Sequence, residues 1–248
     1  MKRVLITGAG SGFGLGASVA LAQRGHHVIA TTESNEQAES LRSAHPELEV
    51  HKLDITTSDV DLVRGFDIDV LLNNAGFGQT GPLADVPLDI VRRVFEVNVF
   101  GTLAVTQAAL PAMVKRGNGR IIIVSSIAGH IAGPAFGPYT MSKFALEGMG
   151  KTLRGELFGQ GIDVCLLNPG PYNTGFNDRM AASMWDWFND DAVSGAQKPL
   201  YQMMRDMITS GQMDPQEVVD EMVRLVEAES TEENNFVPAA IKEQLGIK

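Results

Sequence analysis

Apolar runs of strand length alternate with helix-length segments along most of the chain. The apolar runs fall near residues 3–8, 26–32, 48–55, 68–76, 120–126 and 162–170, and they are rich in Val, Ile and Leu. Strands that are apolar along their whole length are typical of a parallel sheet that is buried on both faces. The repeated β-α pattern therefore predicts an α/β fold, with a single doubly wound parallel sheet and helices on both faces.

Helices are predicted between these strands, and a last strand is predicted near residues 234–238. The helical segments lie near residues 16–25, 35–44, 88–116, 139–158 and 215–229. No linker-like break interrupts the alternation, so we predict one domain over residues 1–248. Ligands of such sheets bind beyond the carboxyl ends of the strands.

One segment, residues 173–213, departs from the pattern. It carries both tryptophans and many of the methionines, and it separates the sixth strand from the helix at residue 215. It is either a set of packed helices with Trp and Met in their core, or a lid over the substrate; the two interpretations are compatible. We favour the lid, because the segment emerges where ligands bind and long insertions in compact domains are often lids.

Composition excludes several classes of function. A formal net charge of −10 argues against a nucleic-acid partner, which would need a basic face. The longest apolar runs are too short to span a bilayer, and the N-terminus has no secretory pattern, so we expect no membrane association. The single cysteine, Cys165, excludes an internal disulfide and predicts a cytoplasmic protein. We expect no metal site.

The stretch "TGAGSGFG" follows the first predicted strand and opens the first helix. Its glycines Gly8, Gly12 and Gly14 have the spacing G-x-x-x-G-x-G. Such glycines allow a tight turn and let a pyrophosphate approach the N-terminus of the helix closely. Any tight strand-to-helix turn could use them, but their place in the first β-α unit favours a dinucleotide.

The stretch "GPYTMSKFALEGM" places Tyr139 and Lys143 four positions apart on a predicted helix. Side chains with this spacing lie on the same face, one turn apart. By themselves such residues are usually found on a helix surface, so the pair needs further context before it indicates chemistry.

That context is a set of motifs that occur in a fixed order. The stretches "TGAGSGFG", "LDI", "NNAG", "VNVFG", "IIIVSS", "YTMSK" and "NPGPYNT" run from Arg3 to about Thr174. Together they resemble the short-chain dehydrogenase/reductase family, of the short single-domain type. The resemblance implies a Rossmann-like fold, a nicotinamide cofactor, and an oxidoreductase that interconverts an alcohol and a ketone or aldehyde. It also implies a homodimer or homotetramer.

The same resemblance implies four catalytic residues: Asn98, Ser126, Tyr139 and Lys143. Ser126 is preferred over Ser125, because the family's serine lies thirteen residues before its tyrosine. Tyr139 would act as the acid/base. The ordinary pKa of a tyrosine is ~10, and Lys143 and an oxidised nicotinamide are expected to lower it. Ser126 would hold the substrate oxygen and Asn98 would help to relay protons, although Asn98 could also be a buried helix kink and Ser126 a helix cap.

The residues that the resemblance places at the cofactor come from every β-α unit of the first 174 residues. Asp54 is expected at the adenine ring, although a capping role at the strand end would also suit it, and Thr174 is expected at the carboxamide. The full set is Gly8, Ser11, Gly12, Phe13, Gly14, Thr32, Glu33, Asp54, Ile55, Asn74, Ala75, Gly76, Tyr139, Lys143, Pro169, Gly170 and Thr174.

The end of the second strand predicts NAD rather than NADP. An acidic residue there binds the ribose 2′-OH of NAD, whereas an arginine receives the 2′-phosphate of NADP. The family's usual aspartate position holds Thr32, and the next position holds Glu33, which would repel a phosphate.

The substrate is expected to be an apolar small molecule of small to medium size. The residues assigned to it are Ser126, His130, Tyr139, Tyr172, Met184 and Trp185. Tyr172 stands where the family usually has a small aliphatic residue. A solvated loop histidine is an alternative interpretation of His130. The chain also lacks the family's common glycine-rich "DGG" type of tail, which leaves the usual subunit contact there open.

Two other functions compete with this prediction. One is a non-redox enzyme of the same fold, such as a dehalogenase or isomerase. Halohydrin-type relatives replace the lysine with arginine and break the glycine loop, and this sequence does neither. The other is a catalytically silent NAD(P)-binding regulator, against which the complete set of four catalytic residues argues.

Overall fold

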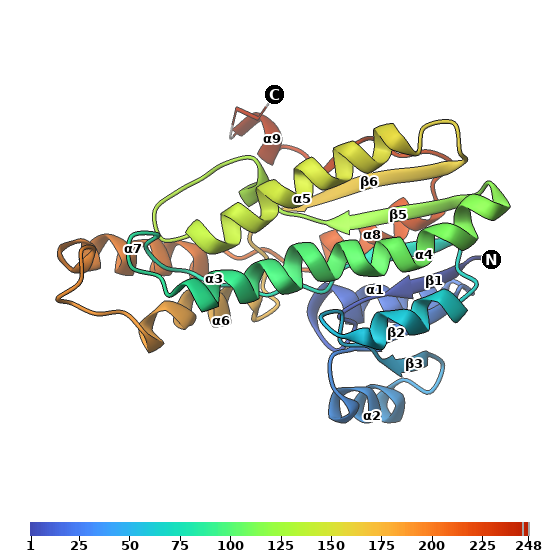
Figure 1. Cartoon of the computed structure of the whole chain (residues 1–248), viewed down its shortest axis with the longest axis horizontal. Helices are drawn as coiled ribbons and strands as arrows, with labels where there is room; N and C mark the ends of the chain where they lie inside the picture. The colour runs from blue at the N-terminus through green and yellow to red at the C-terminus, as the bar shows by residue number, and fades with distance from the viewer. Residues whose placement is uncertain (245, 248) are drawn as a thin grey trace.

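The protein is built on one seven-stranded parallel sheet (Figure 1). The computed structural model describes residues 1–244 and 246–247. The strand order is β3-β2-β1-β4-β5-β6-β7. The strands are β1 (Arg3–Ile6), β2 (His27–Thr32), β3 (Glu49–Lys52), β4 (Val70–Asn73), β5 (Gly119–Val124), β6 (Ile162–Pro169) and β7 (Asn234–Val237). The predicted doubly wound sheet is confirmed, and the order reverses between β1 and β4, where such folds bind ligands.

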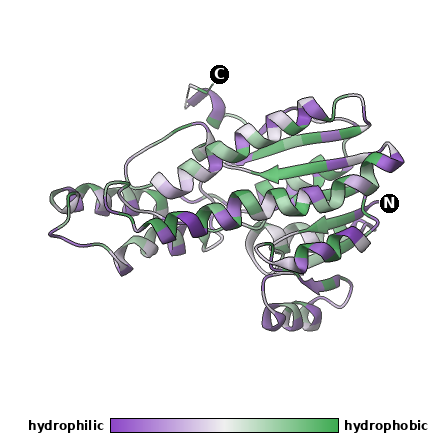
Figure 2. Ribbon diagram, in the orientation of Figure 1, coloured by the Kyte–Doolittle hydropathy of each residue, from purple (hydrophilic) through white to green (hydrophobic). Residues whose placement is uncertain are grey.

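Alternate residues of each strand enter two separate cores. Along β1, Val4 and Ile6 belong to one core and Leu5 to the other, and all three are fully buried. The first core is closed by α1 (Gly12–Gln23), α2 (Asn35–Ala44) and α8 (Gln216–Glu227); the second is closed by α4 (Thr102–Arg116), α5 (Gly137–Glu156) and the 3₁₀ segment Ser58–Gly65. The strands are therefore mainly hydrophobic along their length (Figure 2), as two-sided burial requires.

The predicted helix over residues 88–116 is continuous but not uniform. It consists of α3 (Leu88–Phe95), a π-helical segment Glu96–Gly101, and α4, and it ends at Gly117 in a left-handed conformation. By length and composition alone this helix could cross a membrane. It packs on the sheet instead, with Val105 and Met113 fully buried, as the core helix of a soluble protein does.

Residues 173–213, which we call the lid segment, form a lobe beyond the carboxyl ends of the strands (left in Figure 1). The lobe contains α6 (Phe176–Ala182), two short 3₁₀ turns and α7 (Lys198–Thr209). Met184 and Tyr201 are buried in a small core of its own, against which Trp185, Trp187 and Phe188 pack. This packing explains why position 81, outside the segment, holds a glycine: a Cβ there would lie 2.3 Å from the Trp187 ring. The chain ends in α9 (Ile241–Gln244).

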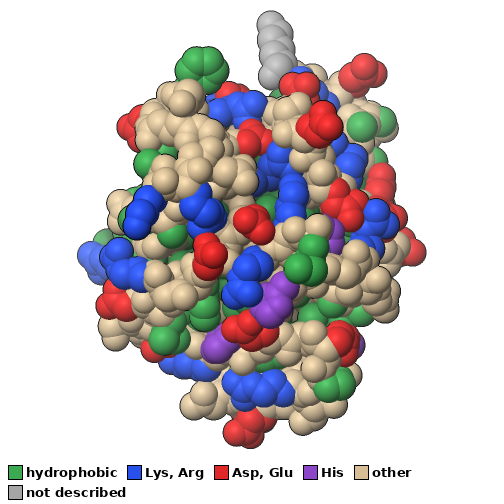
Figure 3. Space-filling view, turned by 90° about the vertical axis from the view of Figure 1, so that its right-hand side faces the viewer, with side chains coloured by type: hydrophobic (Ala, Val, Ile, Leu, Met, Phe, Trp, Pro, Cys, Tyr) green, Lys and Arg blue, Asp and Glu red, His purple; other side chains and the backbone are tan. Residues whose placement is uncertain are grey.

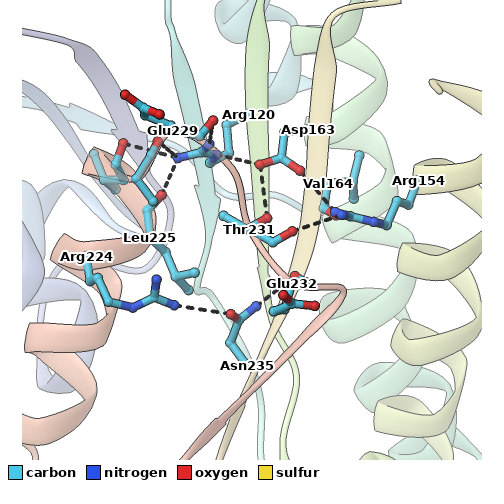
Figure 4. A network of polar contacts seen from close by, with 12 residues as sticks. Arg120, Arg154, Asp163, Val164, Arg224, Leu225, Glu229, Thr231, Glu232 and Asn235 are labelled. Atoms are coloured by element: carbon cyan, nitrogen blue, oxygen red, sulfur yellow. Dashed lines mark hydrogen bonds and ion pairs between the residues drawn. The ribbon is translucent and has the colours of Figure 1, made fainter. Parts of the chain in front are cut away.

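A buried polar network ties the amino ends of β5 and β6 to the end of α8 (Figure 4). The Arg120 guanidinium is 7% exposed; it donates to Asp163 Oδ2 at 2.9 Å and to the backbone carbonyl oxygens of Leu225, Ala228 and Glu229. Arg154 donates to the other Asp163 oxygen at 3.0 Å. Arg120 thus binds the Leu225 carbonyl in the last turn of α8, where a helix leaves its carbonyls without partners, and two carbonyls of the segment that follows.

The end of the molecule that faces away from the lobe has a mixed charge (Figure 3). Histidine, basic and acidic side chains intermingle there. A mixture of signs on this face forms no broad basic surface for nucleic acid.

Candidate active site

One large cavity lies beyond the carboxyl ends of the strands, at the reversal between β1 and β4. Its volume is about 1240 Å³, larger than the ~300–1,000 Å³ of pockets for drug-sized ligands. Most of the predicted cofactor residues line it: Gly8, Ser11, Gly12, Phe13, Thr32, Glu33, Asp54, Ile55, Asn74, Ala75, Gly76, Tyr139, Lys143, Pro169, Gly170 and Thr174. The cavity can hold a molecule the size of a dinucleotide together with a second ligand.

The glycine turn packs closely against neighbouring backbone, because its glycines have no Cβ. Gly8 and Gly12 have φ values of +66° and +55°, which residues with a Cβ rarely adopt. Gly14 is not in the cavity lining but lies behind it, where a Cβ would come within 2.5 Å of Asn74 Nδ2 and of the Gly8 carbonyl. Asn74 fixes the turn by donating to the carbonyls of Thr7 and Gly8. The turn therefore presents the N-terminus of α1 to the cavity.

Three side chains mark the end of the cavity next to β2 and β3. Thr32 is buried and donates to the Ser34 carbonyl, whereas Glu33 is exposed and lines the cavity. The Asp54 carboxylate accepts from the backbone N–H and the hydroxyl of Thr56. Asp54 thus stabilises the turn after β3 and also lines the cavity, so the two interpretations of this residue do not exclude each other.

Tyr139, Lys143 and Ser126 meet at the opposite end of the cavity. Tyr139 and Lys143 are 9% and 5% exposed, so they are not surface residues of α5. The Lys143 ammonium donates to the Val124 carbonyl at 2.8 Å and lies 5.4 Å from the centre of the Tyr139 ring. Ser126 Oγ accepts from the Ala128 N–H, so it caps a short 3₁₀ helix while it also faces the cavity.

Burial dominates the acid–base properties of this group. It raises the pKa of Tyr139 to about 12, and a hydrogen bond from Ser126 opposes the rise. Burial also lowers the pKa of Lys143 to about 8, against the attraction of Glu147, which raises it. The sequence predicted a lowered pKa for Tyr139. With the groups of the chain alone, its pKa is raised instead. At neutral pH Tyr139 carries its proton.

Asn98 lies in the π-helical segment and acts on the loop after β4. Its Oδ1 accepts from the Phe77 N–H at 2.6 Å, and its Nδ2 donates to the Phe77 carbonyl and to Ser142 Oγ, both at 2.9 Å. The buried, hydrogen-bonding kink that the sequence left open is therefore present. Asn98 joins the cavity loop to α5, next to the turn that carries Lys143.

The wall formed by the loop after β6 is aromatic. The Tyr172 ring packs edge-on against Phe13 of the glycine turn, with 5.8 Å between ring centres, and its hydroxyl donates to Glu217 at 2.8 Å. Thr174 lies against Gly12, where a Cβ would be 3.3 Å from the threonine Cβ. Phe176 packs 5.8 Å from Tyr139. The loop therefore brings the lid segment into contact with both ends of the site.

Three residues assigned to the substrate lie elsewhere. Met184 and Trp185 belong to the core of the lobe, because they pack on Tyr201 of α7 rather than on the cavity. His130 is not a solvated loop residue either; its side chain is 12% exposed and contacts Asn168 and Glu147 behind α5. The lid segment instead supplies residues that the sequence reasoning did not name: Phe176, Met180, Met204, Met207 and Ile208. The i, i+3, i+4 spacing of the last three was the available signal.

Comparison with known proteins agrees with this geometry. Residues 2–185 match the family described as short chain dehydrogenase. The chain is 40% identical to the uncharacterized oxidoreductase YusZ of Bacillus subtilis, over 90% of this chain and 84% of the relative, and 31% identical to retinol dehydrogenase 8 of Bos taurus, over 91% and 78%. A crystal structure of a short-chain dehydrogenase from Streptomyces avermitilis superposes with a TM-score of 0.84, at 29% identity, over 99% of this chain and 92% of the other. The chain therefore belongs to the short-chain dehydrogenase family of oxidoreductases.

Proposed function

We propose that the protein uses NAD(H) to interconvert an alcohol and a ketone or aldehyde on an apolar substrate. The observation that carries the proposal is the meeting of Tyr139, Lys143 and Ser126 at one end of a cavity whose other end is a glycine turn. Carbonyl reduction develops negative charge on the substrate oxygen. At that point it needs a proton donor and groups that stabilise the charge.

The residues of the cavity fit a nicotinamide dinucleotide. The N–H groups at the start of α1 would bind its pyrophosphate, because a helix N-terminus attracts anions and Gly12 leaves the approach open. Glu33 would accept from the ribose hydroxyls, and Thr174 would face the carboxamide. When bound, the nicotinamide supplies or accepts the hydride.

Each residue of the catalytic group then has a separate task. Ser126 holds the substrate oxygen, and Tyr139 donates its hydroxyl proton to that oxygen during reduction or withdraws it during oxidation. The Lys143 charge favours the phenolate that remains, as does a positively charged ring near Tyr139. Asn98 holds the loop at Phe77 against α5 through its hydrogen bonds to Phe77 and Ser142.

Carbonyl reduction should lose rate as the pH rises through about 8. The pKa of Lys143 is lowered to about 8 by burial, so the charged form that supports Tyr139 is present below this pH and is lost above it. The measurement is the pH dependence of kcat for reduction at saturating substrates. A rate that stays flat up to pH 10 would contradict the role given to Lys143.

The apolar residues of the lid segment support a lipid-like or aromatic substrate. Met204, Met207 and Ile208 of α7 line the cavity, as do Phe136 and Phe176. Retinol dehydrogenase 8, one of the similar proteins, is named for an apolar alcohol. Closing α7 over such a substrate would exclude water from the reacting atoms.

A panel of secondary and primary alcohols and their carbonyl partners tests the function and the cofactor together. We expect turnover, followed by the absorbance of the reduced nicotinamide, with kcat/KM at least about tenfold higher for NADH than for NADPH, because Glu33 repels a 2′-phosphate. A preference for NADPH would refute the role of Glu33. Cofactor binding without turnover of any pair would favour the silent regulator.

The exposed apolar side chains of the long helices support a homo-oligomer. Phe100 follows Asn98 in the π-helical segment, and Met141 and Phe144 lie on the neighbouring α5; all three are exposed. Packing these side chains against a second copy would give the homodimer or homotetramer that the family resemblance implies.

A further inference from the structure

A second polar cluster lies directly behind the catalytic group, on the same face of α5. Glu147 is one helical turn beyond Lys143, just as Lys143 is one turn beyond Tyr139. Glu147 is 4% exposed, and it is absent from the cavity lining. A carboxylate is almost never this deeply buried unless it is paired.

The partners of Glu147 come from two other parts of the chain. Asn168 of β6 donates from Nδ2 to Glu147 Oε1 at 2.6 Å. His130 follows the short helix that Ser126 caps, and its Nε2 lies 3.2 Å from Glu147 Oε2 and 3.2 Å from Asn168 Nδ2. The bond to Glu147 Oε1 fixes the Asn168 amide with its nitrogen facing the carboxylate.

Glu147, Ser125 and the backbone of Lys143 all lie close to Gly129. A Cβ placed on Gly129 would lie 2.8 Å from Glu147 Cγ, 3.0 Å from Ser125 Oγ and 3.1 Å from the Lys143 carbonyl. Gly129 thus lets the β5 end and α5 approach closely at this point. Ser125 Oγ, Glu147 Oε2 and Asn168 Oδ1 are buried and have no hydrogen-bond partner among the described residues.

The charged and titratable groups around Glu147 are few. From α5 itself come Lys143 and, 4.0 Å from Oε2 and partly exposed, Lys151. From the segment after β5 comes His130, whose ring packs on Phe236 of β7. The neighbouring strands contribute only the uncharged Ser125 and Asn168. A buried carboxylate among these groups acts on Lys143 with little screening.

We propose that Glu147 is a positioning residue for the reaction at Tyr139: its buried carboxylate keeps the Lys143 side chain charged and oriented, and Asn168 and His130 hold that carboxylate in place. The proposal rests on the proposed function, because it takes Lys143 to act in the reaction. The attraction between the two charges agrees with the geometry, since Glu147 raises the pKa of Lys143 against the effect of burial.

The direct test is the titration of Lys143 by NMR in protein labelled with ¹³C at lysine Cε, with its signal assigned from Lys143→Arg. We expect Glu147→Gln to lower the pH at which Lys143 loses its proton by about 1 unit. Glu147→Asp should restore part of the difference because it keeps the charge. The matched control is Glu156→Gln, the same change at an exposed position of α5, which should leave the titration unchanged. An unchanged Lys143 titration in Glu147→Gln overturns the proposal.

The Lys143 titration is independent of turnover, so it separates this inference from the proposed function.

The kinetic counterpart is the pH profile of carbonyl reduction. In Glu147→Gln the fall of kcat at alkaline pH should begin about 1 unit lower than in wild type, with the change absent in Glu156→Gln. A uniform loss of rate with an unshifted profile would show a purely structural role for Glu147. If no substrate pair is turned over while the Lys143 titration still shifts, the proposed function fails and the coupling stands.

Discussion

Replacing Tyr139 with phenylalanine is expected to lower kcat by about 10³-fold, in both directions of the reaction. General acid–base catalysis is worth ~10²–10⁴-fold, and the substitution removes only the hydroxyl that carries the proton. The ring would stay in place, because it packs against Phe176 and is buried on α5. The measurement is the steady-state rate with the best substrate pair of the panel, together with NADH affinity from tryptophan fluorescence, which should be unchanged.

The matched control is Tyr201→Phe. Tyr201 is a buried tyrosine of α7 that belongs to the core of the lobe rather than to the cavity, so its hydroxyl should not matter for the rate. A Tyr139→Phe enzyme that keeps full activity would remove Tyr139 from the mechanism. An equal loss in Tyr201→Phe would point to general disturbance of the lobe.

Replacing Arg120 with methionine is expected to lower the free energy of unfolding by about 3 kcal/mol, since breaking a buried ion pair costs ~3–5 kcal/mol. The change leaves the Asp163 carboxylate without one of its two cations and removes the donor to the carbonyls of Leu225 and Ala228 at the end of α8. Whole domains are stable by only ~5–15 kcal/mol, so this is a large fraction. The measurement is urea unfolding at pH 7, followed by circular dichroism.

The matched control for this variant is Arg64→Met. Arg64 pairs with Asp61 at the surface, with its side chain 59% exposed, and exposed pairs contribute little to stability. We expect its unfolding midpoint to match wild type. If Arg120→Met unfolded at the same urea concentration as Arg64→Met, the network of Figure 4 would not be a stabilising element.

The sheet was predictable because each of its strands can be recognised from its own residues. A parallel strand buried on both faces must be apolar at every position, so Val4, Leu5 and Ile6 could be recognised without knowing their neighbours. The ends of elements were less accessible. The first helix begins at Gly12 rather than near residue 16, because glycines with low helix propensity conceal its first turn.

Motif order predicted that Ser126, Tyr139 and Lys143 would share one site, and the residues around them were not predictable. The assignment of Met184 and Trp185 to the substrate followed from their apolar character, which does not reveal which partner they face. The two side chains pack on Tyr201 of another helix, and the sequence does not reveal that contact. Glu147 resembles an ordinary solvated glutamate in a helix, and only Asn168 and His130, brought together by the fold, make it a buried one.

The π-helical segment Glu96–Gly101 has a consequence for engineering the enzyme. A π turn holds one residue more than an α turn, so deleting a residue between 96 and 101 would convert it into an ordinary α turn that keeps α4 in phase with the sheet but no longer places Asn98 as the π turn does. The same deletion would break the hydrogen bonds of Asn98 with Phe77 and Ser142. Libraries that aim at new substrates should therefore vary length and sequence in the lobe around α7, and should preserve the residue count of this one turn.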